Sequence, residues 1–88
     1  MPPLEQFKQF HEPLLLNEGF TKVFDLPHKI RYRHGDGTTM DIEWENEKQV
    51  LFVTTILPDT MYHSHISLED KSGIFKRLVG RLHDPAYR

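Results

Sequence analysis

Apolar and charged residues alternate along residues 29–45, on both sides of a glycine-rich break at 35–37. Alternation with a period of two is typical of strands with one buried and one exposed face, because successive side chains point to opposite sides. The segment therefore predicts a β-hairpin with one apolar and one charged face. The apolar face contains Ile30, Tyr32, Met40, Ile42 and Trp44, and the charged face contains Lys29, Arg31, Arg33, Asp41, Glu43 and Glu45.

The charges on the two arms of the hairpin have opposite signs, and this determines the register that we predict. A three-residue loop over 36–38, with Gly37 at positive φ, keeps the apolar and charged faces separate. Each facing pair of opposite charges contributes only about 0.2–1 kcal/mol, so the pairs set the register more than the stability. The facing pairs in this register are Arg33 with Asp41, Arg31 with Glu43 and Lys29 with Glu45.

Helical spacing of apolar residues marks both ends of the chain. Residues 4–15 have apolar side chains three and four positions apart, which predicts an amphipathic helix. Pro13 removes a backbone hydrogen bond there, so we expect a kink or two short helices that end at Gly19. A second helix is predicted near the C-terminus, with Ser67 or Ser72 as its N-cap. Its predicted buried stripe is Ile74, Phe75, Leu78, Val79 and Leu82.

Three further segments predict strands. A tight turn at 46–48 leads into 50–57, an apolar run rich in β-branched residues, which predicts a strand inside the sheet. A proline turn follows, 61–66 return as another strand, and 20–24 form a short edge strand. The elements predict a single small α+β domain over residues 1–88, with an N-terminal helix, an antiparallel β-meander of three to five strands and a C-terminal helix packed on one sheet face.

The strand at 50–57 differs from the hairpin because both of its faces are apolar. If the helices cover Val50, Phe52 and Ile56 together with the apolar face of the hairpin, the other face of this strand is an uncovered apolar strip. Such a strip is typical of a protein-binding surface. The predicted binding residues are Leu51, Val53 and Thr55, with Arg31, Arg33, Asp41 and Glu43 as a charged rim.

The sequence allows two arrangements of this strip. Either 20–24 or 61–66 covers it within the domain, or a partner covers it. In the second case the chain is a non-catalytic protein–protein interaction domain of the adaptor, small chaperone or inhibitor type, which binds another protein or a second copy of itself in a homodimer. Strand pairing at a sheet edge is a further route, which an edge bearing Lys29, Arg31 and Arg33 would oppose.

Composition and charge narrow the classes of function. The 88 residues carry a formal net charge of −2 with a pI near 6.3, so no overall basic field recruits nucleic acid or an anionic membrane. No apolar run approaches the roughly 18 residues that span a bilayer. The chain has no cysteine, which excludes disulfides and thiolate nucleophiles and suits a reducing compartment. We therefore expect a cytoplasmic protein that does not associate with membranes.

The chain has no recognisable catalytic motif. Ser64 lies between two histidines without a nucleophile elbow, and the hairpin carboxylates face cations that lower their pKa, the wrong direction for a general acid at neutral pH. Residues 35–37 form a turn rather than a phosphate loop, because Asp36 would repel phosphate and no helix follows. We expect no enzyme activity and no cofactor.

Two alternatives rest on histidines and on basic residues. His63 and His65 share one face of a predicted strand, but a metal site needs a third ligand, and no spacing in the sequence forces one close. We predict no metal site and keep histidine metal binding as an alternative. The other alternative is RNA binding, through the aromatic residues Tyr32, Trp44 and Phe52 and through a basic C-terminal helix. The cations of that helix are Lys71, Lys76, Arg77 and Arg81.

Overall fold

The computed structural model describes residues 2–69 and 73–82. Within them two helices come first, five strands follow, and a third helix ends the described chain. This order confirms the predicted α+β class with its antiparallel meander between terminal helices. The elements are α1 (Pro3–Phe10), α2 (Glu12–Asn17), β1 (Phe20–Asp25), β2 (Lys29–His34), β3 (Thr39–Glu45), β4 (Val50–Ile56), β5 (Met61–Ile66) and α3 (Ile74–Leu82).

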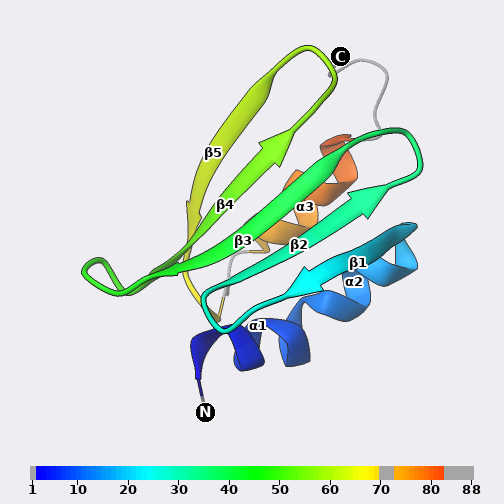
Figure 1. Cartoon of the computed structure of the whole chain (residues 1–88). Coiled ribbons are helices and arrows are strands. Elements are labelled where there is room, and N and C mark those ends of the chain that lie inside the picture. Colours follow the sequence, from blue (N-terminus) through cyan, green and yellow to red (C-terminus); the bar gives the residue numbers. More distant parts are fainter. Residues whose placement is uncertain (1, 70–72, 83–88) are drawn as a thin grey trace.

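The strands form one antiparallel sheet in the order in which they occur in the chain, β1-β2-β3-β4-β5. Strands β1 and β5 are therefore the two outer strands, and the helices all lie on the same side of the sheet (Figure 1). We call the side toward the helices the covered face and the opposite side the open face.

The N-terminal apolar stretch forms two short helices, as its proline predicts. Pro13 lies in the first turn of α2, where its missing N–H breaks no hydrogen bond of the helix. The chain leaves α2 through Gly19, whose φ of 99° suits glycine and strains other residues. The buried residues of the two helices are Leu4, Phe7 and Leu15.

The β2–β3 hairpin has a three-residue loop with Gly37 at positive φ, as predicted, but its register differs from the prediction by two residues. The loop is 35–37 rather than 36–38, because the His34 N–H donates to the Thr38 carbonyl at 2.8 Å. A shift of two residues leaves every side chain on its predicted face. The facing pairs are Arg31 with Asp41, Lys29 with Glu43 and Arg33 with Thr39.

The connection between β3 and β4 decides which face of β4 is buried. It has four residues, 46–49, instead of the expected three, and Gln49 adopts a φ of 55°. Glu45 consequently pairs with Val50. One extra loop residue shifts the alternation by one position, so every side chain of β4 lies on the face opposite to the predicted one.

The three residues predicted to form an uncovered strip are therefore buried. Leu51, Val53 and Thr55 lie on the covered face and are at most 1% exposed. The prediction that these residues are available to a partner was wrong, because Trp44, Ile42 and Met40 lie directly beside them under the helices. The residues that β4 presents on the open face are Val50, Phe52, Thr54 and Ile56, all half-buried.

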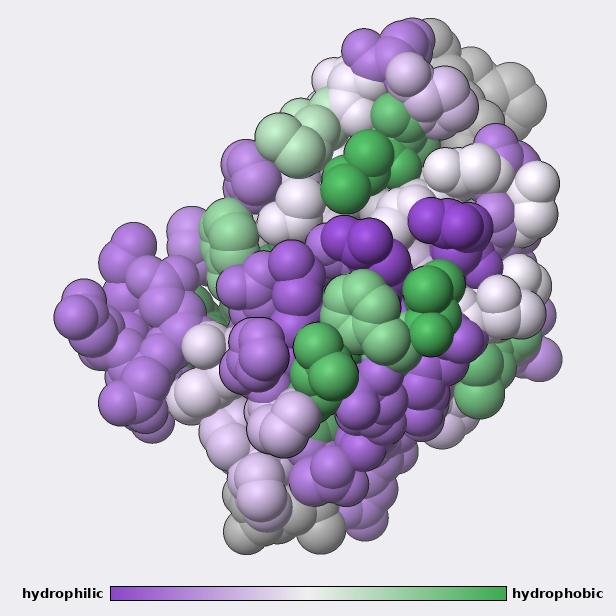
Figure 2. All heavy atoms as spheres, in the orientation of Figure 1, coloured by the Kyte–Doolittle hydropathy of each residue, from purple (hydrophilic) through white to green (hydrophobic). Residues whose placement is uncertain are grey.

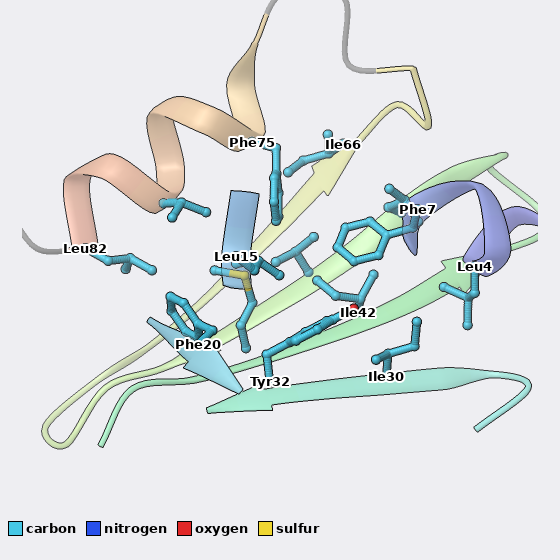
Figure 3. Packing of buried hydrophobic residues seen from close by; sticks show 14 of the residues in the cluster. Leu4, Phe7, Leu15, Phe20, Ile30, Tyr32, Ile42, Ile66, Phe75 and Leu82 are labelled. Atoms are coloured by element: carbon cyan, nitrogen blue, oxygen red, sulfur yellow. The ribbon is translucent and has the colours of Figure 1, made fainter. Parts of the chain in front are cut away.

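The core lies between the covered face and the helices (Figure 3). Tyr32 is its largest fully buried side chain, and its hydroxyl donates a hydrogen bond to Glu12 of α2 at 3.0 Å. Burial, together with the nearby Glu12 carboxylate, raises the pKa of the Tyr32 phenol far above its ordinary value. Phe7 of α1 meets Phe75 of α3 edge to face, with ring centroids 5.5 Å apart, so helices from both ends of the chain meet above the sheet.

Helix α3 begins too far along the chain for Ser67, one of its two predicted N-caps. Its first residue is Ile74, preceded by Gly73 at a φ of 71°, so Ser67 is too far away to cap it. Ser72, the other predicted cap, lies outside the described residues. Phe75, Val79 and Leu82 are buried as predicted, whereas Leu78 is half-buried and Ile74 is exposed.

Candidate functional site

The open face presents a different kind of side chain on each strand from β2 to β5. Strand β2 contributes cations, β3 mainly carboxylates, β4 mainly apolar residues and β5 mainly histidines. Figure 2 shows this side of the molecule, where hydrophilic residues cover most of the surface and hydrophobic ones form separate islands. The residues are Lys29, Arg31 and Arg33, then Thr39, Asp41, Glu43 and Glu45, then Val50, Phe52, Thr54 and Ile56, then Met61, His63 and His65.

The cations and carboxylates of the open face largely neutralise one another. Arg31 forms a two-pronged ion pair with Asp41, with its Nε and Nη2 atoms 2.7 and 2.8 Å from the two carboxylate oxygens. Burial by itself raises the pKa of the Asp41 carboxyl, but the hydrogen bonds and charge of Arg31, helped by Lys29, hold it below its ordinary value. Lys29 also lies 3.3 Å from Glu43. These ion pairs stabilise the sheet, and the charges in them need no charged partner molecule.

The two histidines of β5 are held by neighbours on the same face. The His63 ring stacks on Phe52 at 5.1 Å between centroids, and the His65 ring lies 5.1 Å from Phe52 at a tilt. His63 Nδ1 is 3.2 Å from the Thr54 hydroxyl, and His65 Nε2 is 3.2 Å from the Glu45 carboxylate. Both imidazoles therefore have structural roles in the open face.

The metal and RNA alternatives gain little from this geometry. Among residues 2–69 and 73–82, no three histidine, aspartate or glutamate side chains are grouped so that they could hold a metal ion. The aromatic platform proposed for RNA is divided, because Tyr32 and Trp44 lie on the covered face and Phe52 on the open face. The basic residues Lys76, Arg77 and Arg81 are exposed on α3, and Lys71 lies outside the described residues.

Strand β5 leaves a regular row of backbone groups without partners on its outer side. The Leu57 N–H donates to the Thr60 carbonyl at 2.8 Å, so this pair and every second pair after it exchange the hydrogen bonds between β4 and β5. The intervening residues of β5 direct their N–H and C=O groups outward. These residues are Met61, His63 and His65, and no other described residue bonds to their outward groups.

The side chains of β5 do not protect this edge. Natural outer strands are usually guarded by lysine, proline, a bulge or a covering segment. Residues 61–66 contain no lysine, arginine, carboxylate or proline, and their pairing with β4 is free of bulges. Met61 is 54% exposed and Tyr62 is 40% exposed. Strand β5 thus combines unpaired backbone with exposed apolar surface.

The other outer strand, β1, is closed by a bulge and by ion pairs. Its register with β2 shifts after Lys22, which bends the strand and interrupts its outward row. The Lys22 ammonium lies 2.7 Å from Glu12 of α2 and 3.3 Å from Asp25, and Lys8 of α1 lies 2.9 Å from Asp25. Hydrogen bonds from Lys8 and Lys22 hold the pKa of Asp25 below its ordinary value. Both N-terminal helices are thereby tied to this edge.

A groove of about 380 Å³ lies between β5 and α3. Its walls are apolar and basic, and none of the described residues that line it is acidic. Ile74 at one end of the groove is 44% exposed, although helical spacing predicts it to be buried. The lining residues are Tyr62, His63 and Ser64 of β5 and Ile74, Arg77, Leu78, Arg81 and Leu82 of α3.

The predicted binding residues are only partly brought together. Arg31, Arg33, Asp41 and Glu43 share the open face, whereas Leu51, Val53 and Thr55 lie beneath it. Strand β2 is not an outer strand, because β1 pairs with it, so its cations guard no edge. Sequence reasoning missed the edge of β5 and the groove beside it. The signal for them was a strand without charge or proline, next to a helix with arginines four residues apart.

Comparisons of the chain with models of protein families, with curated proteins and with solved structures find no match. Membrane-spanning helices are also absent from the described part of the chain, since no helix there is long and apolar enough to cross a bilayer. The geometry of the sheet, of its two outer strands and of the groove is therefore the basis for a functional proposal.

Proposed function

We propose that this chain is a non-catalytic protein-binding domain that adds an extended segment of a partner protein to strand β5. The observation that carries the proposal is the row of outward N–H and C=O groups at Met61, His63 and His65. An unpaired outer strand is a template for another strand, and the main-chain hydrogen bonds supply affinity. Domains of the adaptor, inhibitor or small chaperone type use this mode of binding.

The surroundings of β5 support binding rather than chance exposure. Tyr62 and Met61 place aromatic and thioether surface beside the free backbone, and both residue types are enriched in protein interfaces. Ile74 of α3 adds further exposed apolar surface next to the groove. A partner strand would lie about 4.8 Å beyond β5 and cover part of this surface.

The direct test compares two substitutions at one position of β5. The His63 N–H points outward, so His63→Pro removes a bond to a partner without removing one to β4. His63→Ala also removes the imidazole but keeps the N–H. The probe is a fluorescein-labelled, capped octapeptide of alternating valine and threonine, and the readout is fluorescence anisotropy.

We expect the native chain and His63→Ala to bind the probe with similar affinity, and His63→Pro to bind at least about tenfold more weakly. A version of the probe with alternate amides N-methylated should not bind, and this control leaves the protein unchanged. If no binding occurs at millimolar probe, or if the proline variant and the methylated probe bind normally, strand addition at β5 is wrong.

A further inference from the structure

Ser64 is the smallest residue that β5 contributes to the groove between β5 and α3. On the covered face of β5 the side chains follow one another as Tyr62, Ser64 and Ile66, so a small residue lies between two large ones. Ser64 is half-buried, and the groove lies on the side of the sheet toward α3 (Figure 1). A side chain placed over Ser64 would therefore lie between β5 and α3.

A strand added to β5 directs one side chain to this position. In antiparallel pairing, each residue of the added strand lies opposite one residue of β5, and both side chains point to the same face. The outward backbone groups belong to Met61, His63 and His65, so Ser64 falls in a pair without hydrogen bonds, with Cα atoms about 4.5 Å apart. The opposite side chain would point toward α3, and an aromatic ring there would also reach Tyr62 along the diagonal.

The walls of the groove are suited to a flat apolar ring. Leu78 and Leu82 line the groove from α3, the first half-buried and the second buried. The groove has a volume of about 380 Å³, and a cavity of about 150 Å³ is large enough to bind benzene. The groove therefore has room for the ring of an aromatic side chain, the kind of side chain that dominates the energetics of interfaces.

Arg77 supplies the electrostatic part of the match. Its side chain is exposed and lines the groove, and no described residue forms an ion pair or a hydrogen bond with its guanidinium. A guanidinium is attracted to the electron-rich face of an aromatic ring and stacks on it. A carboxylate would also attract Arg77, but it would bring a charge against Leu78 and Leu82, which costs solvation energy. The groove thus complements an aromatic ring better than an acidic group.

Resting on the proposed function, we propose that the groove selects the partner: an extended segment whose residue opposite Ser64 is phenylalanine, tyrosine or tryptophan. The ring would pack on Leu78 and Leu82 beside the Arg77 guanidinium, while the backbone on either side of it pairs with β5. This deepens strand addition into a preference for segments that carry an aromatic anchor residue.

The groove disfavours a second copy of the chain as the occupant. In a twofold antiparallel pair of β5 strands centred on His63, Tyr62 of each copy would lie opposite Ser64 of the other. Tyr62 is itself a wall of the groove, so a ring that crossed to the other copy would leave its own groove without that wall. The two Arg77 side chains would also lie on the same side of the joined sheet, where like charges repel.

A nucleic acid base also offers an aromatic ring, but it fits this site less well than a peptide does. RNA cannot exchange N–H and C=O hydrogen bonds with the edge of β5. The formal net charge of −2 on the chain also opposes the approach of a polyanion. A peptide satisfies the edge and the groove together.

The test uses the full chain and four labelled, capped octapeptides. One is the valine–threonine probe, and in the other three a central valine is replaced by phenylalanine, cyclohexylalanine or glutamate. Cyclohexylalanine has nearly the shape of phenylalanine but no aromatic ring, so it separates the attraction of a cation to the ring from apolar packing. Fluorescence anisotropy gives the affinities, and thermal unfolding confirms that each variant is folded.

We expect the phenylalanine peptide to bind at least about tenfold more tightly than the valine–threonine probe. The cyclohexylalanine peptide should bind about three- to fivefold more weakly than the phenylalanine peptide, because it is not attracted to the Arg77 guanidinium. The glutamate peptide should bind no more tightly than the probe, because the groove has apolar walls.

Substitutions in the groove separate the two parts of the match. Ser64→Leu fills the space under the ring and should bring the phenylalanine peptide down to the affinity of the probe. Arg77→Gln removes the charge, so the difference between the phenylalanine and cyclohexylalanine peptides should disappear. Lys76→Gln removes an exposed charge of α3 outside the groove and should change the affinity of either peptide by less than about twofold.

A phenylalanine peptide that binds no better than the probe, with binding still lost in His63→Pro, would overturn the aromatic preference and leave strand addition standing. Absence of binding for all four peptides would overturn both. Tighter binding of the glutamate peptide than of the phenylalanine peptide would overturn the chemical class of the anchor. A dimer of the chain that His63→Pro abolishes in light scattering, or a single-stranded RNA that displaces the phenylalanine peptide more effectively than unlabelled peptide does, would overturn the choice of occupant.

Discussion

Strands β1 and β5 both form an outer margin of the same sheet, but only β1 is closed. A bulge after Lys22 bends β1, and the ion pairs of Lys8, Lys22 and Asp25 fasten it to α1 and α2. Strand β5 pairs with β4 without a register shift, has no lysine, arginine or carboxylate, and is bordered by a groove. The two margins therefore differ in both backbone and side chains.

This difference suggests what is structural and what is functional in the domain. Edge protection is a general need of soluble sheets, and β1 meets it with several devices at once. Charged side chains of the open face also neutralise one another, because Arg31 and Lys29 form ion pairs with carboxylates of β3. Among the described residues, what is left for a partner is the outward backbone of β5 at Met61, His63 and His65.

The largest predicted loss of stability tests which face of β4 is buried. Val53→Asp places a carboxylate in the core beside Ile42, and we expect it to cost about 4 kcal/mol or more and to unfold the domain. Ile56→Asp changes the same strand on the open face and should leave a cooperative thermal transition by circular dichroism. Equal loss of structure in both variants would show that the faces are wrongly assigned.

A smaller loss of stability is predicted when the Arg31–Asp41 ion pair of the open face is removed. Asp41→Ala leaves Arg31 without its two-pronged partner and should cost about 2–3 kcal/mol in urea unfolding, because the Asp41 side chain is only 5% exposed. Glu43→Ala, at a side chain that is 40% exposed, should cost under about 1 kcal/mol.

The same pair gives a pH dependence with a definite sign. The pKa of Asp41 is lower in the folded chain than in the unfolded chain, so the unfolded state binds the proton first. The stability from the pair is complete above the unfolded pKa of about 4 and is lost as the pH falls through the folded pKa. Asp41→Ala should flatten the dependence in this range, and an unchanged acid profile would contradict the assignment.

A rise of about 1 kcal/mol in the free energy of unfolding is predicted for a substitution at Thr55, in the strand next to β5. The Thr55 hydroxyl is buried and has no hydrogen-bond partner among the described residues. Thr55→Val keeps the shape and removes the unsatisfied group, so we expect the free energy of unfolding to rise by about 1 kcal/mol. Peptide binding at β5 should not change, because Thr55 lies inside the sheet. A loss of stability would indicate a partner for this hydroxyl.

The smallest effect concerns the closed edge. Asp25→Ala removes the shared partner of Lys8 and Lys22, but the side chains are partly exposed, so the expected cost is under about 1 kcal/mol. Because the bulge persists, the variant should not gain a second site for the valine–threonine peptide. A second binding event in isothermal titration calorimetry would show that ion pairs alone close β1.

Much of the fold was predictable because its signals are local. The alternation in the hairpin, the proline at 13 and the β-branched run at 50–57 were sufficient for α1, α2 and the strands β2 to β4, and the apolar spacing over 74–82 was sufficient for α3. The buried face of β4 was not predictable in the same way, because it depends on whether the preceding loop has three residues or four. The positive φ of Gln49 allows the longer loop, and glutamine gives no clear signal for that conformation.

The candidate site was less predictable than the fold because it depends on which strand lacks a neighbouring strand. A binding strip was expected from apolar residues, yet Leu51 and Val53 supply the core. The free edge of β5 follows from the strand order, in which the described part of the chain has no strand beyond Met61–Ile66. The groove follows from the packing of α3, which leaves Ile74 outside the core and Arg77 beside β5.

Amide hydrogen exchange, followed by NMR with and without the valine–threonine peptide, compares both edges in one experiment. If the peptide adds as a strand to β5, exchange at the amides of Met61, His63 and His65 should slow by about tenfold or more, while exchange along β1 stays unchanged. Slower exchange along β1, or shifts confined to Phe52 and its neighbours on the open face with none at the β5 amides, would contradict strand addition at β5.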